Sequence, residues 1–264
     1  MKLGYSFCPN DTFIFHALTH GLVPGEQVEE VLADVETLNQ WAREGRLELT
    51  KVSYHAFFHV LDGYVALRSG GALGRGVGPL LVAKPGVALH KVATPGEWTT
   101  AHLLLKLAQP QATVSMRYDL IIPAILSGQV DGGVLIHESR FAFQDYGLEA
   151  RLDLGEWWEK DSGLPLPLGA ILARRDLGGR RLQELDAAVR TSLEMAWRDP
   201  ARSKAYIRQH AHELSEEVVE RHIRTYVNEF SRDLGAEGEA AVRELHRRAV
   251  VAGITPASNC SLFV

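Results

Sequence analysis

Cysteine is scarce in this chain of 264 residues, which holds only Cys8 and Cys260. Two cysteines at opposite ends, without a C-x-x-C pair or a cysteine–histidine cluster, argue against a disulfide framework and a structural zinc site. The H-E-x-x-H motif is absent too, and no carboxylates stand out at ligand spacing, so we expect no metal. The simplest interpretation is a protein of a reducing compartment.

Long apolar runs and blocks of like charge are missing as well. No run approaches the roughly 20 apolar residues of a membrane-spanning helix, and the first residues turn polar too early for a secretory signal. The net charge is only −5, and the charged residues are spread along the chain. We therefore expect a cytoplasmic protein with no membrane and no nucleic-acid partner, present as a monomer or a homodimer.

Short strand-like runs alternate with helix-like runs in the first two thirds of the chain. This rhythm predicts mainly parallel sheets with helices on their faces. It is interrupted by a glycine-rich stretch that has neither the P-loop nor the dinucleotide pattern, and it restarts near residue 92. After about residue 178, apolar residues three or four apart predict helices only. The expected strands span 3–7, 28–33, 47–52, 64–67, 92–93, 112–116, 134–136 and 148–152, and the expected helices before residue 178 span 12–19, 35–43, 54–61, 101–108 and 120–126.

Two α/β units followed by a helical tail predict two lobes joined by two extended connections, near 83–86 and 168–172. We expect a periplasmic-binding-protein-like fold of type II, with a central ligand cleft and a helical C-terminal segment packed on the large lobe. Residues 1–84 and 171–264 would form the large lobe, and residues 85–170 the small lobe. A single doubly wound domain is the alternative.

Four stretches follow expected strands, and in open parallel sheets ligands lie beyond the carboxyl ends of the strands. They are residues 8–12, 51–54, 95–100 and 137–140. Each also has a structural interpretation as a helix cap or a strand end. For residues 8–12, Cys-Pro-Asn-Asp-Thr, we expect Asn10, Asp11 and Thr12 to cap the first helix and shape the cleft, and Cys8 only to pack.

Polar side chains in the other three stretches suit the binding of an anion and the transfer of a proton. Lys51 and Ser53 could bind an anionic substrate, although a strand-end lysine and a capping serine explain them equally well. Thr99 and Thr100 enter a helix, where free N–H groups attract a carboxylate or an oxyanion. His137 follows an apolar strand and is the candidate general base, because a histidine titrates near neutral pH.

A family resemblance runs in order over nearly the whole chain. The blocks that carry it are CPNDTFIFHAL, DVETLN, TKVSYHAF, RSGGALGRGVGPLLVA, PGEWTTAHLLL, LIHESRF, LGEWWE and GLPLPLGAILARRDLG, with TYVNEFSRDLG in the tail. In these blocks the chain resembles the 1,4-dihydroxy-6-naphthoate synthases, enzymes of the futalosine route to menaquinone. It departs from the family pattern at Phe7, where we expect a proline, and at Glu97-Trp98, where we expect a more basic pair.

The resemblance implies a lyase that cleaves cyclic dehypoxanthine futalosine, a carboxylate, to 1,4-dihydroxy-6-naphthoate without a cofactor. The family's catalytic histidine falls on His137, and its substrate-binding residues fall on Lys51-Val52-Ser53 and Thr99-Thr100. Two alternatives stay open. One is a non-catalytic protein of the same fold that binds a small carboxylate, and the other is a ligand-sensing domain. The full set of substrate-binding candidates is Asn10, Asp11, Lys51, Val52, Ser53, Thr99 and Thr100.

Overall fold

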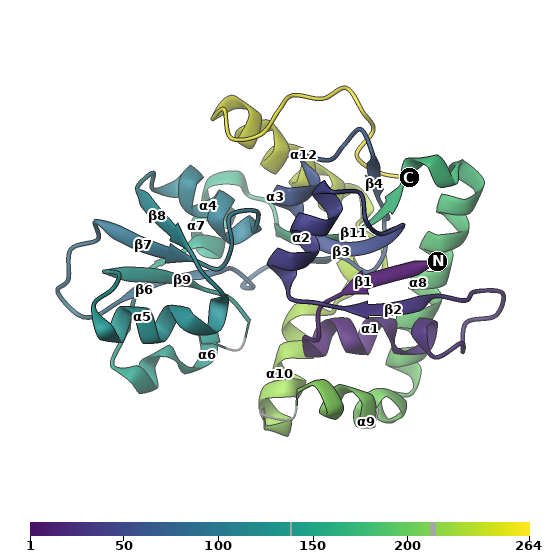
Figure 1. Cartoon of the computed structure of the whole chain (residues 1–264), viewed down its shortest axis with the longest axis horizontal. Helices are drawn as coiled ribbons and strands as arrows, with labels where there is room; N and C mark the ends of the chain where they lie inside the picture. The colour runs from purple at the N-terminus through teal and green to yellow at the C-terminus, as the bar shows by residue number, and fades with distance from the viewer. Residues whose placement is uncertain (138, 212–214) are drawn as a thin grey trace.

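Two β-sheets lie side by side in the computed structural model, each with helices packed on it (Figure 1). The structure describes residues 1–137, 139–211 and 215–264. We call the larger sheet with its helices the large lobe, and the smaller sheet with its helices the small lobe. The strands are β1 (Lys2–Tyr5), β2 (Glu29–Leu32), β3 (Leu49–Ser53), β4 (Tyr64–Ala66), β5 (Ala72–Gly74), β6 (Leu80–Ala83), β7 (Lys91–Thr94), β8 (Ala112–Ser115), β9 (Gly132–Leu135), β10 (Glu149–Asp153) and β11 (Leu166–Arg174).

The helices fall into three groups along the chain. The large lobe begins with α1 (Pro9–Thr19), α2 (Val35–Arg43) and the short α3 (Tyr54–Phe57). The small lobe holds α4 (Thr100–Ala108), α5 (Ile121–Ser127), α6 (Ser139–Ala142) and α7 (Leu154–Ser162), with short 3-10 turns at Tyr118–Leu120 and Phe143–Tyr146. After a third 3-10 turn at Arg175–Leu177, the chain continues as α8 (Gly179–Arg198), α9 (Ala201–His210), α10 (Glu216–Tyr226), α11 (Glu229–Arg232) and α12 (Gly235–Val251).

Both sheets mix parallel and antiparallel pairs. In the larger sheet, ordered β2-β1-β3-β11-β4 with β5 also beside β11, β1 runs parallel to β2 and β3, whereas β11 runs antiparallel to its neighbours. In the smaller sheet, ordered β10-β6-β9-β7-β8, β7 is parallel to β8 and β9, whereas β6 is antiparallel to β9 and β10. The expected parallel pairing therefore holds only within the βαβ units, where a crossover helix carries the chain back so that the next strand runs in the same direction. The strands β6 and β11 follow the crossings between the sheets and pair antiparallel with their neighbours.

The chain changes sheets between β5 and β6 and again between β10 and β11. Two segments therefore differ from the expected division. Residues 80–83, expected in the large lobe, pair within the smaller sheet, and residues 166–170, expected in the small lobe, belong to β11 of the larger sheet. The apolar run 79–83 contains β6, the first strand after the crossing, and so does not end the large lobe. A division of the chain into independent lobes stays a prediction.

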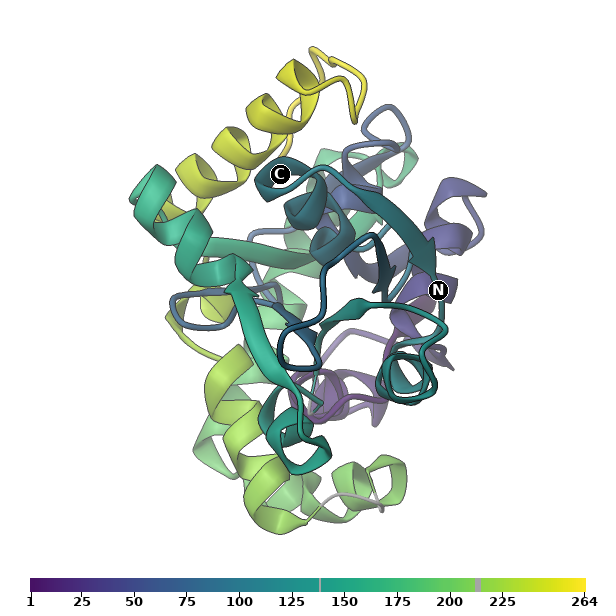
Figure 2. The same ribbon diagram turned by 90° about the vertical axis from the view of Figure 1, so that its left-hand side faces the viewer.

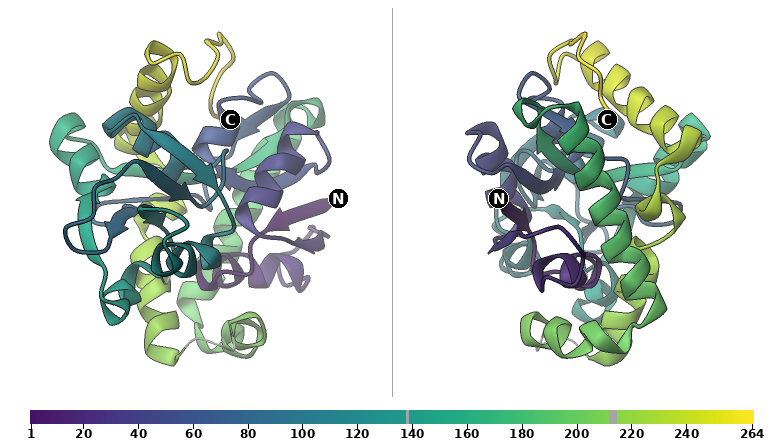
Figure 3. Two further views of the ribbon diagram at one scale, coloured as in Figure 1. Left: turned by 60° about the vertical axis from the view of Figure 1, so that its left-hand side comes forward. Right: turned by 90° about the vertical axis from the view of Figure 1, so that its right-hand side faces the viewer.

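The side chains of β11 alternate between two cores, as expected for a central strand covered on both faces. Ile171 and Ala173 join Leu185 and Val189 of α8 and Phe15 of α1 in one core. Their neighbours along the strand point to the second core, which holds buried residues of α2, α3 and α12 and extends into the small lobe. In the right-hand view of Figure 3, the long green helix α8 runs over the outer side of the large lobe.

The C-terminal segment is helical over α8 to α12, as predicted, and then returns to the larger sheet, where Phe263 bridges to Ala66. Figure 2, in which the small lobe faces the viewer, shows these green-to-yellow helices at its upper and lower edges. Helix α10 packs against α1, the first helix of the large lobe. In the described part of the chain, no helix combines the length and the apolar character that crossing a membrane requires.

Candidate functional site

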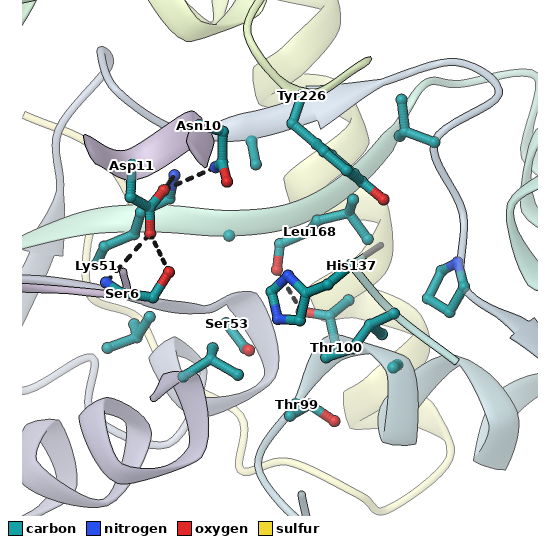
Figure 4. A pocket seen from close by; sticks show the side chains of 18 of the residues that line it. Ser6, Asn10, Asp11, Lys51, Ser53, Thr99, Thr100, His137, Leu168 and Tyr226 are labelled. Atoms are coloured by element: carbon teal, nitrogen blue, oxygen red, sulfur yellow. Dashed lines mark hydrogen bonds and ion pairs between the residues drawn. The ribbon is translucent and has the colours of Figure 1, made fainter. Parts of the chain in front are cut away.

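A cavity opens between the ends of strands from both sheets and encloses about 760 Å³, counting its mouth. All eight predicted site residues line it (Figure 4), although their roles stay predictions. The lining consists of Ser6, Asn10, Asp11, Val35, Leu38, Lys51, Val52, Ser53, Ala72, Val77, Pro79, Thr99, Thr100, Ala101, Ile136, His137, Leu168, Gly169, His222 and Tyr226.

His137 stands two residues after β9 and points into the cavity (Figure 4). Its backbone φ is 55°, and within the described ranges no other residue except glycine has a positive φ. Such left-handed backbone is costly and concentrates at functional positions. The Cys8 sulfur lies 3.4 Å from the His137 Nδ1, and the Tyr118 ring centroid lies 5.0 Å from that of His137. Cys8 thus lies against the candidate base, and our expectation that it only packs stays a prediction.

Helix α1 begins earlier than the sequence suggested. Its first residue is Pro9, and Cys8 occupies the N-cap position without a side-chain hydrogen bond. The predicted capping by Asn10 and Asp11 is therefore wrong. Proline, with its fixed φ, suits the first helical position, so these two residues fall inside the first turn. Their side chains join a buried polar network instead.

Asp11 is the centre of that network (Figure 4). Its carboxylate forms a buried ion pair with the Lys51 ammonium and accepts hydrogen bonds from the Ser6 hydroxyl and the Asn10 amide, both at 2.7 Å. The other end of the Asn10 amide lies 3.0 Å from the His222 Nε2. Lys51, expected to bind an anion, thus has its charge balanced by the protein, and a direct contact with a ligand stays a prediction.

Ser53 is held by an asparagine rather than by the helix it precedes. Helix α3 has only four residues, and the Ser53 side chain does not cap it. Instead, the Asn39 amide nitrogen donates to the Ser53 hydroxyl at 3.3 Å, and the Ser53 N–H donates to the Asn39 carbonyl oxygen at 2.9 Å. Because this hydroxyl accepts from Asn39, its own hydrogen is available to a ligand.

Thr99 and Thr100 open helix α4, as predicted. The Thr99 hydroxyl accepts from the His102 N–H at 3.2 Å and donates to the Gly96 carbonyl, while the Thr100 hydroxyl donates to the Leu168 carbonyl at 2.7 Å. Both hydroxyl hydrogens are thus engaged, one of them across the two lobes. The backbone N–H groups of the first turn, which have no acceptor within the helix, are the better anion donors here.

His222 and Tyr226 are cavity residues that the sequence did not reveal. Both come from α10, and their rings lie 4.7 Å apart between centroids. The sequence shows His222 only as one of several helical histidines, because the contact of α10 with α1 is a tertiary feature. Burial lowers the pKa of His222 to about 3, and the nearby positive groups of His137, Lys51 and Arg140 act in the same direction. His222 is therefore neutral at physiological pH.

The site offers two neighbouring histidines, of which His222 is neutral, together with helix N–H donors and a serine hydroxyl, and this set suits proton transfer to or from a small anion. Within the described residues, no three His, Cys, Asp or Glu side chains are placed to share a metal ion.

Comparison with known proteins places this geometry in context. A family model described as menaquinone biosynthesis matches residues 1–250. A 1,4-dihydroxy-6-naphthoate synthase from Thermus thermophilus is 56% identical, with 100% of this chain and 99% of that protein covered. A second protein of that name, from Streptomyces coelicolor, is 46% identical, with 97% of this chain and 95% of that protein covered.

The architecture is also that of binding proteins. The alkanesulfonate-binding protein SsuA from Xanthomonas axonopodis pv. citri, solved with MOPS bound, superposes with a TM-score of 0.72 at 15% identity, covering 97% of this chain and 94% of that chain. At this identity the likeness concerns the fold alone. It confirms the predicted two-lobed, periplasmic-binding-protein-like α/β architecture.

Proposed function

Since the chain belongs to the family of 1,4-dihydroxy-6-naphthoate synthases, which are enzymes of menaquinone biosynthesis, we propose that it converts cyclic dehypoxanthine futalosine to 1,4-dihydroxy-6-naphthoate. The substrate is a small carboxylate with a carbonyl group and a sugar-derived fragment, and we propose that no cofactor takes part. Membership of an enzyme family sets aside the alternative of a protein that only binds a carboxylate, even though the fold is shared with such proteins.

The observation that carries the mechanism is the place of His137, held on a left-handed backbone at the end of β9 with its ring in the cavity. In the proposed first step, a neutral His137 nitrogen takes the proton from the carbon next to the carbonyl. The C–H electron pair becomes the enolate, and His137 becomes an imidazolium. The enolate electrons then form a new ring double bond as the bond to the sugar-derived fragment breaks. The fragment leaves with the electron pair of that bond and takes the proton from the His137 imidazolium, which restores the base, and formation of the aromatic ring drives the reaction.

Fixed donors would stabilise the two negative groups of the reacting molecule, the carboxylate and the enolate oxygen. The N-terminal N–H groups of α4 form one donor set on the small lobe, and the Ser53 hydroxyl forms another on the large lobe. Such preorganised donors are usually the largest single contribution to stabilising developing charge. The ion-paired Lys51 would add positive potential without moving toward the substrate.

Replacing His137 by alanine tests this role. We expect His137→Ala to keep the wild-type circular dichroism and to lose turnover of cyclic dehypoxanthine futalosine by about 10²–10⁴-fold, the usual share of a general base. Formation of 1,4-dihydroxy-6-naphthoate, followed by liquid chromatography, is the readout. His246→Phe, on α12 and outside the cavity lining, is a control that should keep its rate. Turnover near the wild-type rate in His137→Ala would refute the assignment.

A further inference from the structure

A chain of hydrogen bonds fixes which nitrogen of His222 carries the proton. The Asp11 carboxylate is an acceptor only, so the Asn10 amide nitrogen must face it, at 2.7 Å. The Asn10 carbonyl oxygen is then the atom that faces the His222 Nε2, at 3.0 Å. An oxygen acceptor at this distance requires a hydrogen on Nε2. A neutral imidazole with hydrogen on Nε2 has its lone pair on Nδ1.

The Nδ1 atom of His222 is buried, and no group among the described residues hydrogen-bonds to it. The residue is only 1% exposed, yet it lines the cavity beside His137, whose ring lies nearly parallel to it with centroids 6.1 Å apart. A buried acceptor without a partner is costly, and in native proteins it usually has a reason. Here a bound ligand can supply the missing donor.

We propose that the His222 Nδ1 accepts a hydrogen bond from a hydroxyl of the sugar-derived fragment, which makes His222 a specificity-determining residue of this enzyme. This assignment rests on the proposed function. The carboxylate and the carbonyl of the substrate are acceptors, and a nitrogen lone pair would repel both. The hydroxyls of the departing fragment are the donors of the substrate, and that fragment leaves close to the carbon from which His137 takes the proton.

Recognition suits His222 better than proton transfer. The same burial that keeps its imidazole neutral makes it a weak base, and the Nε2 hydrogen is committed to Asn10. A site built around one hydrogen bond rejects a ligand that lacks the matching group, because its own polar atom is then left buried and unpaired. The network from Lys51 through Asp11 and Asn10 thus sets specificity without touching the reacting atoms.

The tautomer is measurable directly in the intact protein. Long-range ¹H–¹⁵N correlation spectra of ¹⁵N-histidine-labelled protein distinguish protonated from unprotonated ring nitrogens. At neutral pH we expect His222 to carry hydrogen on Nε2 only, and we expect Asn10→Leu to populate the other tautomer. A His222 that is protonated on Nδ1, or charged at neutral pH, would overturn the inference, and this measurement needs no variant at His222.

Steady-state kinetics test whether the His222 Nδ1 accepts a hydrogen bond from the substrate. His222→Phe keeps the ring shape and removes both nitrogens, and His246→Phe is the matched control on α12. With cyclic dehypoxanthine futalosine, we expect His222→Phe to raise KM by roughly 10-fold with a smaller change in kcat, and the control to leave both unchanged. We also expect an effect on an analogue in which hydrogen replaces the recognised hydroxyl of the sugar-derived fragment. Relative to the full substrate, its KM should rise by a similar factor with the wild-type enzyme and change little with His222→Phe.

The outcomes separate this inference from the proposed function. Suppose that wild-type protein turns over the substrate, but that removing any one hydroxyl raises KM equally for wild type and for His222→Phe. Then His222 does not recognise a hydroxyl, and this inference fails while the proposed function stands. If wild-type protein forms no 1,4-dihydroxy-6-naphthoate, the proposed function fails and takes the hydroxyl assignment with it. The tautomer spectrum is independent of both results.

Discussion

The buried carboxylate of Asp11 holds the polar wall of the cavity together. It pairs with Lys51 and accepts from Ser6 and Asn10, and both charged side chains are less than a tenth exposed. Taking two charges out of water is expensive, and such a pair persists only when further hydrogen bonds satisfy it, as they do here. The stability of this wall therefore depends on keeping both partners.

Asp11→Asn should be strongly destabilising, because it leaves the Lys51 ammonium buried without a counter-charge. We expect the free energy of unfolding, measured by urea denaturation at neutral pH, to fall by about 3–5 kcal/mol. Glu29→Gln, which removes the exposed partner of Lys2 at 3.8 Å, is the control and should change it by less than about 1 kcal/mol. A loss in Asp11→Asn as small as in the control would contradict this account.

At the scale of elements, the two crossings between the sheets pass against each other at glycines. A Cβ added to Gly78, in the segment between β5 and β6, would lie 2.2 Å from the backbone N and Cα of Gly155, at the start of α7. No side chain fits in that space, and the obstacle is backbone, which cannot rotate away. At Gly78 the absence of a side chain thus permits the close approach of two chain segments.

Gly78→Ala should therefore destabilise the protein by about 1–3 kcal/mol, the usual cost of overpacking. The measurement is again the unfolding free energy in urea. Gly179→Ala at the start of α8, where an added Cβ would meet nothing within 4 Å, is the matched control and should be neutral or slightly stabilising. Equal stability of the two variants would show that the crossing can relax.

Much of this arrangement follows from local patterns, and the remainder depends on contacts between distant segments. The apolar runs that became β1, β3, β7 and β9 predict the βαβ units and place His137 at a strand end, because strand and helix periodicity are local properties. Nothing local reveals that β11 runs antiparallel to β3. The position of His222 in the cavity wall is equally hidden, since it depends on α10 packing against α1.

At the scale of the whole molecule, Trp98 of the small lobe packs against several side chains of the large lobe. The Arg43 guanidinium carbon lies 3.6 Å from the centroid of the Trp98 ring, and the backbone N–H of Trp98 donates to the Glu36 carboxylate at 3.1 Å. The rings of His55 and His59, on or beside α3, lie 5.9 and 5.0 Å from it. With the Thr100–Leu168 hydrogen bond, these contacts tie the lobes together at the rim of the cavity.

Acid should loosen this interface. Burial lowers the pKa of His55 to about 3 and that of His102 to about 4, and the neighbouring His59 and Lys106 favour neutral His55 as well. The unfolded chain binds protons on these histidines from about pH 6.5, before the folded chain does, so stability falls as the pH falls from about 7 to about 5. His55→Phe should show a shallower fall in urea unfolding free energy over this range. A slope equal to wild type would argue against His55 as a contributor.

The cavity wall joins Ser6 near one end of the chain to Tyr226 near the other, with α10 supplying its last side chains. During synthesis on a ribosome, both sheets can therefore form before any complete binding site exists. A nascent chain in which α10 is still inside the exit tunnel lacks His222, so the Asn10 carbonyl oxygen has no imidazole beside it. The wall of the cavity is completed late in translation, after most of the two sheets has emerged.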